Sequence, residues 1–387
     1  MVIMTTIDWQ QLLQDCVYFT QRLIQTPSMT YAEAAIADLI AAEMRRLQFD
    51  EVWLDEIGNV CGRLYGQDRS LGALVLNTHT DHVDPGDLTL WPVPPYSGEI
   101  VDGRICGRGA CDIKGPLAVQ IYSMAALKRA GIIPPRDIVF TGVVQEEIGG
   151  GGSQYWVDHL TYPVDLVVLG EPSSNILSLG HRGILSLWVI FHGRSVHASV
   201  PHKGVNPNYA LATFLQRLPA AQAQLLPHEL LGPTSVAPTL IEVDTRSKNV
   251  TPAWTRVLLD FRTAVESHNS LLAFIDQVAA GLDYTVAPGW TGLEIVDSDA
   301  PIFGFYTPPD SELVERVSAV LSRGMGRLVS LGSYQFATDG RLFAPRQIPV
   351  VGFAPGEEDR AHTVNESIAI DMMAESLHGL VQLLQEF

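Results

Sequence analysis

The sequence has few cysteines, no recognisable leader and no long apolar run. Its cysteines form no Cys-x-x-Cys pair and are too few for a disulfide scaffold, which predicts reduced thiols and a cytoplasmic protein. They are Cys16, Cys61, Cys106 and Cys111. The first residues, MVIMTTIDWQQ, lack the basic and apolar regions of a signal peptide. No segment approaches about 18 consecutive apolar residues, so we expect no membrane partner.

Basic residues are also scarce, with 25 Lys and Arg against 43 Asp and Glu and a formal net charge of −18. Nucleic-acid-binding proteins carry basic patches, so we expect no nucleic-acid partner. The sequence contains no Gly-x-Ser-x-Gly elbow and no recognisable Cys-His motif, which disfavours covalent catalysis. What the chain does have is size and apolar content. With 387 residues, 47% of them hydrophobic, it is long enough for two domains.

Short apolar runs alternate with helical stretches in the first part of the chain. Strands are expected at 72–78, 137–144 and 165–170, and helices at 8–26, 31–49 and after Lys114. This alternation predicts an α/β fold, with a mostly parallel sheet covered by helices on both faces. In such sheets, ligands bind beyond the carboxyl ends of the strands.

The pattern changes near residue 178. Strands are expected at 184–193, 235–244 and 255–262, with helices at 206–219 and 268–283, which suits a smaller α+β domain. The first pattern then resumes with a strand at 348–355 and a helix at 370–386. We therefore expect a catalytic, metal-binding domain made of residues 1–177 and 293–387, interrupted by an inserted α+β domain of residues 178–292.

Acidic and imidazole side chains follow three successive expected strands. His79 and Asp81 follow the first, Glu146 and Glu147 the second, and Glu171 the third. Each signal alone is weak, because a His-x-Asp is usually an ordinary pair and a Glu-Glu is usually a solvated face. Their shared position at strand ends favours one site. In an extended backbone, neighbouring Glu146 and Glu147 would point to different sides, so that one could bind a metal and the other could face a water molecule.

Two further residues, Asp112 and His362, complete a set of imidazole and carboxylate groups without thiolate. Such donors suit zinc, cobalt or manganese. Two histidines with several carboxylates suggest two ions about 3.5–4 Å apart that share a bridging carboxylate. A purely structural role is disfavoured, because carboxylates gathered without cations have raised pKa values and cost stability.

Five segments in a fixed order carry a resemblance to a known family. NTHTDHVDPGD, GRGACDIKGPLA, VVQEEIGGGGS, LGEP and AHTVNE resemble the co-catalytic zinc amidohydrolase and peptidase family. This family includes acetylornithine deacetylase, succinyl-diaminopimelate desuccinylase, aminoacylase and glutamate carboxypeptidase. The resemblance spans nearly the whole chain. It implies two divalent metal ions as cofactors, zinc first, with cobalt or manganese as alternatives.

The resemblance also implies roles for individual residues. His79 and Glu171 would hold one ion, Glu147 and His362 would hold the other, and Asp112 would bridge the two.

Two carboxylates would act beside these ligands. Asp81 would hydrogen-bond to His79 and fix its tautomer. Glu146 would be the general base that takes a proton from the attacking water and returns it to the leaving amine. The family also has a cis peptide bond after the bridging aspartate, here Asp112–Ile113.

The inserted domain resembles the family's dimerisation domain. In the segment GRSVHASVPHKGVNP, His197 matches a histidine that reaches the active site of the partner subunit and stabilises the oxyanion. We therefore expect a homodimer in which each copy completes the site of the other. The alternative is that His197 is an ordinary exposed histidine, and His202 is expected to be only structural.

Three residues are candidates for binding the substrate. Asn249 and Arg262 match positions where the family uses an amide and a guanidinium, and Arg262 would pair with a substrate carboxylate. Without the resemblance, Arg262 reads equally well as a strand-edge arginine. Thr338 is a possible hydrogen-bonding group in a loop where Gln, Phe and Ala at 335–337 replace the family's usual glycines.

The expected function is metal-dependent hydrolysis of the amide bond in a small N-acyl amino acid or related compound that carries a carboxylate. The protein would then resemble a deacetylase or a desuccinylase. A metallo-dipeptidase or carboxypeptidase with the same metals is the alternative within enzymes. A non-catalytic binding protein on the same scaffold is disfavoured, because this chain keeps every candidate ligand and Glu146.

Overall fold

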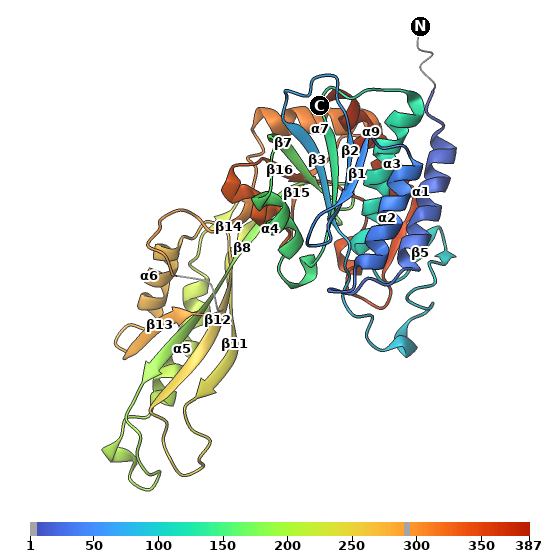
Figure 1. Ribbon diagram of the computed structural model, residues 1–387. Coiled ribbons are helices and arrows are strands. Elements are labelled where there is room, and N and C mark those ends of the chain that lie inside the picture. Colours follow the sequence, from blue (N-terminus) through green and yellow to red (C-terminus); the bar gives the residue numbers. More distant parts are fainter. Residues whose placement is uncertain (1–5, 290–294) are drawn as a thin grey trace. The chain divides into compact units, whose positions relative to one another are not determined.

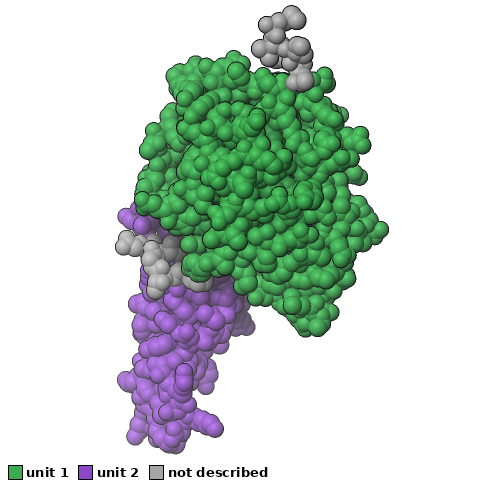
Figure 2. All heavy atoms as spheres, turned by 45° about the vertical axis from the view of Figure 1, so that its right-hand side comes forward, with its two compact units in different colours: residues 1–180, 305–334, 338–387 green, residues 181–304, 335–337 purple. Residues whose placement is uncertain are grey.

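A computed structural model describes residues 6–289 and 295–387 of the chain. The chain divides into two compact units, coloured separately in Figure 2. Unit 1 consists of Met1–Gly180, Phe305–Tyr334 and Thr338–Phe387, and unit 2 consists of His181–Gly304 and Gln335–Ala337. The expected boundary between residues 292 and 293 lies outside the described residues.

Unit 1 is built around a mixed sheet (Figure 1). In spatial order, its strands are β1 (Glu51–Leu54), β2 (Val60–Leu64), β6 (Ile138–Val143), β3 (Ala73–His79), β7 (Val164–Leu169) and β16 (Val350–Gly352). The last four run parallel, and β1 and β2 form an antiparallel edge. All seven residues of β3 are buried, as expected for an apolar strand covered on both faces. The predicted α/β class with a mostly parallel sheet is confirmed.

Helices surround this sheet. They are α1 (Trp9–Ile24), α2 (Ala34–Arg46), α3 (Gly115–Ala130), α4 (Gly151–Asp158), α7 (Glu312–Met325), α8 (Gly340–Phe343) and α9 (Ile370–Glu386). Helices α1, α3, α9 and α7 pack side by side as one layer, and α4 packs with α8 (Figure 1). Helix α1 begins where the Asp8 carboxylate accepts a hydrogen bond from the Gln11 amide, satisfying one donor of the first turn.

A second, small sheet lies at the edge of unit 1. It joins β4 (Ile100–Val101), β5 (Arg104–Cys106) and β17 (Ser367–Ala369), in the order β17-β5-β4. The pairing of β5 with β17 is antiparallel and places Cys106 opposite Ser367. This sheet therefore brings the segment before Asp112 next to the segment after His362.

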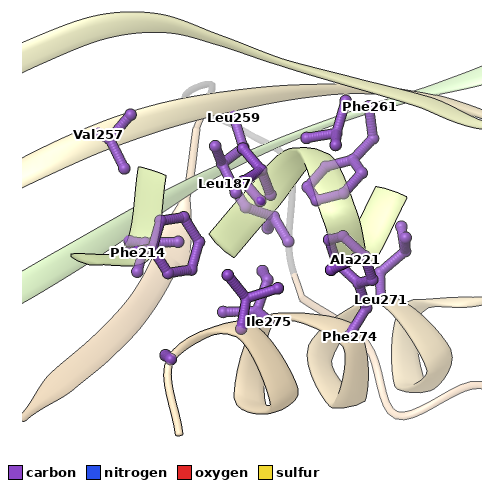
Figure 3. Close-up of a cluster of buried hydrophobic side chains, with 14 of the residues drawn as sticks. Leu187, Phe214, Ala221, Val257, Leu259, Phe261, Leu271, Phe274 and Ile275 are labelled. Carbon is purple, nitrogen blue, oxygen red and sulfur yellow. The ribbon is translucent and has the colours of Figure 1, made fainter. Parts of the chain in front are cut away.

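Unit 2 contains an antiparallel sheet with two helices. Its strands, in the order β11-β12-β8-β13, are β11 (Ser235–Val243), β12 (Trp254–Thr263), β8 (Leu177–His192, which begins in unit 1) and β13 (Tyr284–Pro288). The helices are α5 (Pro207–Gln222) and α6 (His268–Val278). Figure 3 shows the core that α5 and α6 form with these strands, including Leu187, Phe214, Leu259, Phe261 and Ile275. Two features differ from the expectation. The helix expected at 268–283 ends earlier, at Val278, and strand β13 was not expected.

The remaining elements are short. They are β14 (Phe303–Tyr306) and β15 (Leu331–Tyr334), which pair with β8, β9 (Pro227–His228), β10 (Gly232–Pro233), and the single turns Leu88–Leu90, Ala110–Lys114, Glu146–Ile148, Pro201–Lys203, Ala344–Arg346 and Glu358–Arg360. Within residues 6–289 and 295–387, none of the helices combines the length and apolar character that crossing a bilayer requires.

Candidate metal centre

Three neighbouring parallel strands end at the same edge of the sheet. His79 is the last residue of β3, the turn with Glu146 and Glu147 follows β6, and Glu171 comes two residues after β7. Because β3 lies between β6 and β7, the side chains that leave these three strands meet there. The strand-end cluster expected from the sequence is therefore assembled in the fold.

Asp112 lies between the two histidines of this cluster. Its Oδ1 is 3.1 Å from His79 Nε2, and its Oδ2 is 3.1 Å from His362 Nε2. The same His362 Nε2 is 3.1 Å from Glu147 Oε1, and His79 Nε2 is 4.0 Å from Glu171 Oε1. Each imidazole nitrogen thus faces two carboxylates, and the Asp112 carboxylate is common to both.

This arrangement fits two cations. One ring N–H can point at only one carboxylate oxygen, whereas a cation at the point of convergence would contact the nitrogen and both carboxylates. Donor atoms from His79, Asp112 and Glu147 lie within 4.8 Å of one another, and so do those from His79, Glu146 and Glu171. The structure therefore brings all five predicted ligands together, and it adds Glu146 as a neighbour.

The tautomer of His79 is fixed by the backbone. Its Nδ1 is 2.9 Å from the carbonyl oxygen of Asp81, which can only accept, so Nδ1 carries the proton. Nε2 is then the nitrogen that can give its lone pair to a metal ion, in exchange for the proton that it holds against Asp112 in the metal-free cluster. The Asp81 side chain, which the sequence predicts to bond to His79, also lies near this nitrogen, with Oδ1 3.5 Å from Nδ1, and the carbonyl is the closer contact.

The Asp81 carboxylate also holds the turn after β6. Oδ1 accepts a hydrogen bond from the Glu146 amide at 3.1 Å, and Oδ2 accepts one from the Glu147 amide at 3.3 Å. Oδ2 also accepts a bond from the Thr30 hydroxyl at 2.8 Å. Asp81 is fully buried, so these bonds fix the backbone that carries both glutamates.

The backbone at Glu146 and Glu147 is not extended, which corrects the expectation from sequence. The two residues begin a 3₁₀ turn, Glu146–Ile148, that follows Gln145 at a φ of 61°. Successive side chains of a 3₁₀ turn are separated by about a third of a revolution, so the glutamates still point in different directions. Non-glycine residues rarely adopt positive φ, and His362 has the same φ of 61°.

The bridging position lies in an irregular, buried turn. Residues Ala110–Lys114 form a turn of π-helix in which Asp112 has non-helical angles (φ −123°, ψ 78°). The peptide bond Asp112–Ile113 is cis, as the resemblance implies.

The pKa values of these groups show that their negative charges are not balanced when no cation is bound. Burial would lower the pKa of His79, but Asp112 and Asp81 raise it well above its usual value. Burial raises the pKa of Glu171 to about 8, with His79 opposing, and Asp112 and Glu147 raise the pKa of His362 to about 10. Burial opposes ionisation of Asp112, yet the two histidines hold its pKa below its usual range. Protons thus occupy the positions that divalent ions would take.

One buried carboxylate of this region was not predicted as a site residue. Asp339 is 1% exposed, and after burial itself it is the largest cause of the raised pKa of Glu146. A Cβ placed on Gly150 would be 2.3 Å from Asp339 Oδ1, so the glycine run after Glu147 packs directly against this carboxylate. In the same loop, the residue that the sequence predicts to bind the substrate is the neighbouring Thr338. That side chain is fully buried, and its hydroxyl accepts a hydrogen bond from the Gly340 amide.

Three predicted residues lie in unit 2 and are less constrained. His197 Nε2 is 3.4 Å from Asn249 Nδ2, and His197 Nδ1 is 2.7 Å from the Ser199 hydroxyl. Arg262, on β12, donates from Nε to Asp260 Oδ1 at 2.8 Å. The structure therefore brings His197 and Asn249 together within unit 2, and their roles in binding and catalysis stay predictions.

Comparisons with known proteins agree with this geometry. The sequence profile described as peptidase family M20/M25/M40 matches residues 75–386. An uncharacterized protein, YgeY, of Escherichia coli is 27% identical over 91% of this chain and 89% of its own length. A succinyl-diaminopimelate desuccinylase of Rhodospirillum centenum is 29% identical over 92% of this chain and 93% of its own length.

Solved structures share the fold. The aminopeptidase PepT of Bacillus cereus superposes with a TM-score of 0.75 at 21% identity, covering 98% of this chain and 99% of its own. The YxeP protein of Bacillus subtilis, described as a dinuclear metal-binding peptidase, superposes with a TM-score of 0.70 at 13% identity, covering 97% and 99%.

Proposed function

The chain belongs to peptidase family M20/M25/M40, a family of dinuclear metal-dependent enzymes that hydrolyse amide bonds, and from this premise we propose that it cleaves a small N-acyl amino acid or related compound. The observation that carries the proposal is the Asp112 carboxylate, whose two oxygens face the Nε2 atoms of His79 and His362. In this proposal His79 and Glu171 would hold one ion, Glu147 and His362 would hold the other, and Asp112 would be shared by both. When bound, such ions acidify water and polarise an amide carbonyl.

Nitrogen and oxygen donors without thiolate favour zinc, with cobalt or manganese as alternatives. The four thiols are free, and three of them are buried, which suits the reducing cytoplasm that we propose as the location.

Glu146 is proposed as the general base. Its carboxyl group lies within 4.8 Å of the ligand atoms of His79 and Glu171, so it could reach a water molecule bound beside those residues. It would take a proton from the attacking water and return it to the amine that leaves, so no covalent intermediate is needed. The hydrogen bond from the Glu146 amide to the Asp81 carboxylate would hold the Glu146 backbone in place during this transfer.

Unit 2 would supply substrate recognition and the contact between two copies. Arg262 would pair with a substrate carboxylate, since a planar guanidinium binds carboxylates through two parallel hydrogen bonds. A dimer through unit 2 is supported by β11, which ends the strand order and exposes Leu240 and Ile241 by more than half. An edge strand of this kind is a template for pairing with another chain. His197 of a second copy would then stabilise the oxyanion, with Asn249 beside it.

A dipeptidase or carboxypeptidase is the second candidate, because the family name and the solved structures include peptidases. Both activities need a carboxylate-binding group, but only a peptidase must accept an amino acid on each side of the cleaved bond.

The test is a substrate panel with metal analysis. The purified protein, its two ions counted by mass spectrometry, is assayed with zinc, cobalt or manganese on N-acetyl and N-succinyl amino acids and on dipeptides. We expect turnover of acyl amino acids. Activity confined to dipeptides would reject the deacylase, and two bound ions without turnover of either class would favour a binding protein.

A further inference from the structure

Glu366 and Arg108 form a buried ion pair next to the turn that carries Asp112. Neither residue has a role in the proposed mechanism. Glu366 is 1% exposed and Arg108 is 3% exposed. Arg108 Nη1 donates to Glu366 Oε2 at 2.6 Å, and its guanidinium lies over the ring of Trp91, 5.1 Å from the centroid. Buried charges persist where they are paired and hydrogen-bonded, so this pair is expected to have a specific task.

The second oxygen of Glu366 binds the backbone that carries the bridging ligand. Oε1 accepts hydrogen bonds from the amides of Cys111 and Asp112, each at 3.2 Å. The Glu366 carbonyl also accepts a bond from the Gly107 amide at 3.0 Å. Side chain and backbone of one residue therefore hold the first half of the turn that presents Asp112 and the segment that leads into it.

Glu366 is also tied to the other side of the centre through the chain itself. It follows His362 by four residues, and the next residue, Ser367, begins β17, which pairs with β5. One residue thus fixes the position of Asp112 relative to His362, although the two are far apart in the sequence.

A second buried carboxylate, that of Asp81, makes the same kind of contact. Asp81 accepts the amides of Glu146 and Glu147, just as Glu366 accepts those of Cys111 and Asp112. In both cases a buried carboxylate binds two successive amides of a turn that carries a predicted ligand. The repetition indicates that these bonds serve the ligands, since each carboxylate is otherwise costly to bury.

We propose that Glu366, neutralised by Arg108, is a positioning residue that holds Asp112 at the spacing from His362 that the metal pair requires. The inference deepens the proposed function, because it rests on a metal centre at these residues. Residues that orient metal ligands typically contribute about 10–100-fold to metal affinity.

The experiment measures metal affinity of the full-length protein by competition with a chromogenic chelator, using zinc alone as the probe. Glu366→Gln keeps an oxygen for the two amides but sets a neutral group against Arg108, and Glu366→Ala removes both contacts. We expect zinc affinity to fall about 10-fold or more in Glu366→Gln and further in Glu366→Ala. At limiting zinc, kcat should fall with KM unchanged, and excess zinc should restore kcat in part.

The matched control is Glu43→Gln. Glu43 is also a buried carboxylate, bound to Arg46 at 2.7 Å and to the Tyr122 hydroxyl, but these contacts and a longer one to Arg22 lie on α1, α2 and α3. We expect a similar loss of thermal stability with wild-type zinc affinity. Glu366→Asp keeps the charge but shortens the reach to the amides, so it serves if Glu366→Ala does not fold.

Wild-type zinc affinity in a folded Glu366 variant, with a stability loss like that of Glu43→Gln, would overturn the inference and leave the proposed function intact. A wild-type protein that binds no zinc would instead reject the metal centre, and with it the proposed function.

Discussion

The two units present their functional candidates in opposite ways. In unit 1, His79, Asp112 and Glu171 are each less than 9% exposed, while His362 is half-exposed, and buried carboxylates hold the turns that carry Asp112 and Glu147. In unit 2, His197 and Asn249 are exposed, and Arg262 is held by a residue two positions away on its own strand. The first group is positioned before anything binds, whereas the second group is held only by local contacts.

The sheets differ in the same sense. Strand β3 of unit 1 is buried along its whole length, so side chains leave it at one defined point, the strand end. Strand β11 of unit 2 is exposed from Ala237 to Val243, because Val236 is its only residue in the core around α5 and α6, part of which Figure 3 shows. This difference suggests that unit 1 supplies the chemistry and that unit 2 acquires its final geometry from a substrate or a second copy.

The largest effect is expected when the proposed base of unit 1 is removed. Glu146→Gln should lower kcat by about 10²–10⁴-fold, the usual contribution of a positioned general base, while two ions stay bound. Steady-state kinetics and metal counting check both parts. Loss of an ion together with activity would make Glu146 a ligand, which its place beside His79 and Glu171 also allows.

The next largest effect should come from unit 2. His197→Ala should lower kcat by about 10²–10³-fold, the typical cost of one oxyanion donor, and His202→Ala, in the same loop, should leave kcat unchanged. Mixing inactive Glu146→Gln and His197→Ala proteins should restore activity, because a mixed dimer contains one intact site.

With random exchange, the restored activity should approach about a quarter of the wild-type value, since half of the dimers are mixed and each has one working site of two. Assays after subunit exchange, with size determined by analytical ultracentrifugation, check this. If exchange occurs and activity does not return, His197 does not act across the dimer.

A smaller effect is expected at the proposed carboxylate-binding group. Arg262→Lys should raise KM about 10-fold with little change in kcat, because lysine loses the two-pronged pairing while keeping the charge. Arg256→Lys is the matched control, since Arg256 lies on the same strand and pairs with Glu242. Equal KM values for both variants would leave Arg262 as an ordinary strand-edge arginine.

The last prediction concerns stability and pH in the metal-free protein. The folded-state pKa values of Glu171, about 8, and His362, about 10, are raised, so the folded protein binds more protons than the unfolded chain. Their contribution is full at low pH and is lost as pH rises from 4.5 to 8 for Glu171 and from 6.5 to 10 for His362.

Glu171 should contribute at most about 1.4 kcal/mol per pH unit, and the half-exposed His362 less. Bound ions displace these protons, so the zinc-loaded protein should melt higher and lack this decline. Thermal unfolding of metal-free and loaded protein between pH 5 and 9 tests the prediction. Parallel curves would mean that these groups do not share the site with the ions.

Much of unit 1 could be predicted because its signals are local. The apolar run of β3 and the position of His79 at its end are visible in the sequence, and parallel strands place such ends together. Asp339 and Glu366 could not be assigned roles in this way. Their contacts, such as Glu366 with Cys111, join residues far apart in the sequence, and no periodicity reports them.

Local backbone geometry was the other source of error. The 3₁₀ turn at Glu146 depends on Gln145 adopting a positive φ and on the Asp81 carboxylate accepting two amides, and a propensity argument contains neither. The same applies to the end of α6 at Val278, where the turn through Gly281, at a φ of 80°, leads into β13.

The glycine run after Glu147 has a practical consequence for protein engineering. Four consecutive glycines look like a spacer that tolerates grafts and insertions, yet a Cβ at Gly150 would meet Asp339 and one at Gly152 would be 2.4 Å from the Val144 carbonyl oxygen. Mutant libraries should therefore keep this run unchanged. Around Gly86 and Gly103 a Cβ would meet no atom within 4 Å, but their φ values of 72° and 73° favour glycine, so a tag or a reporter is better attached beside these glycines than in place of them.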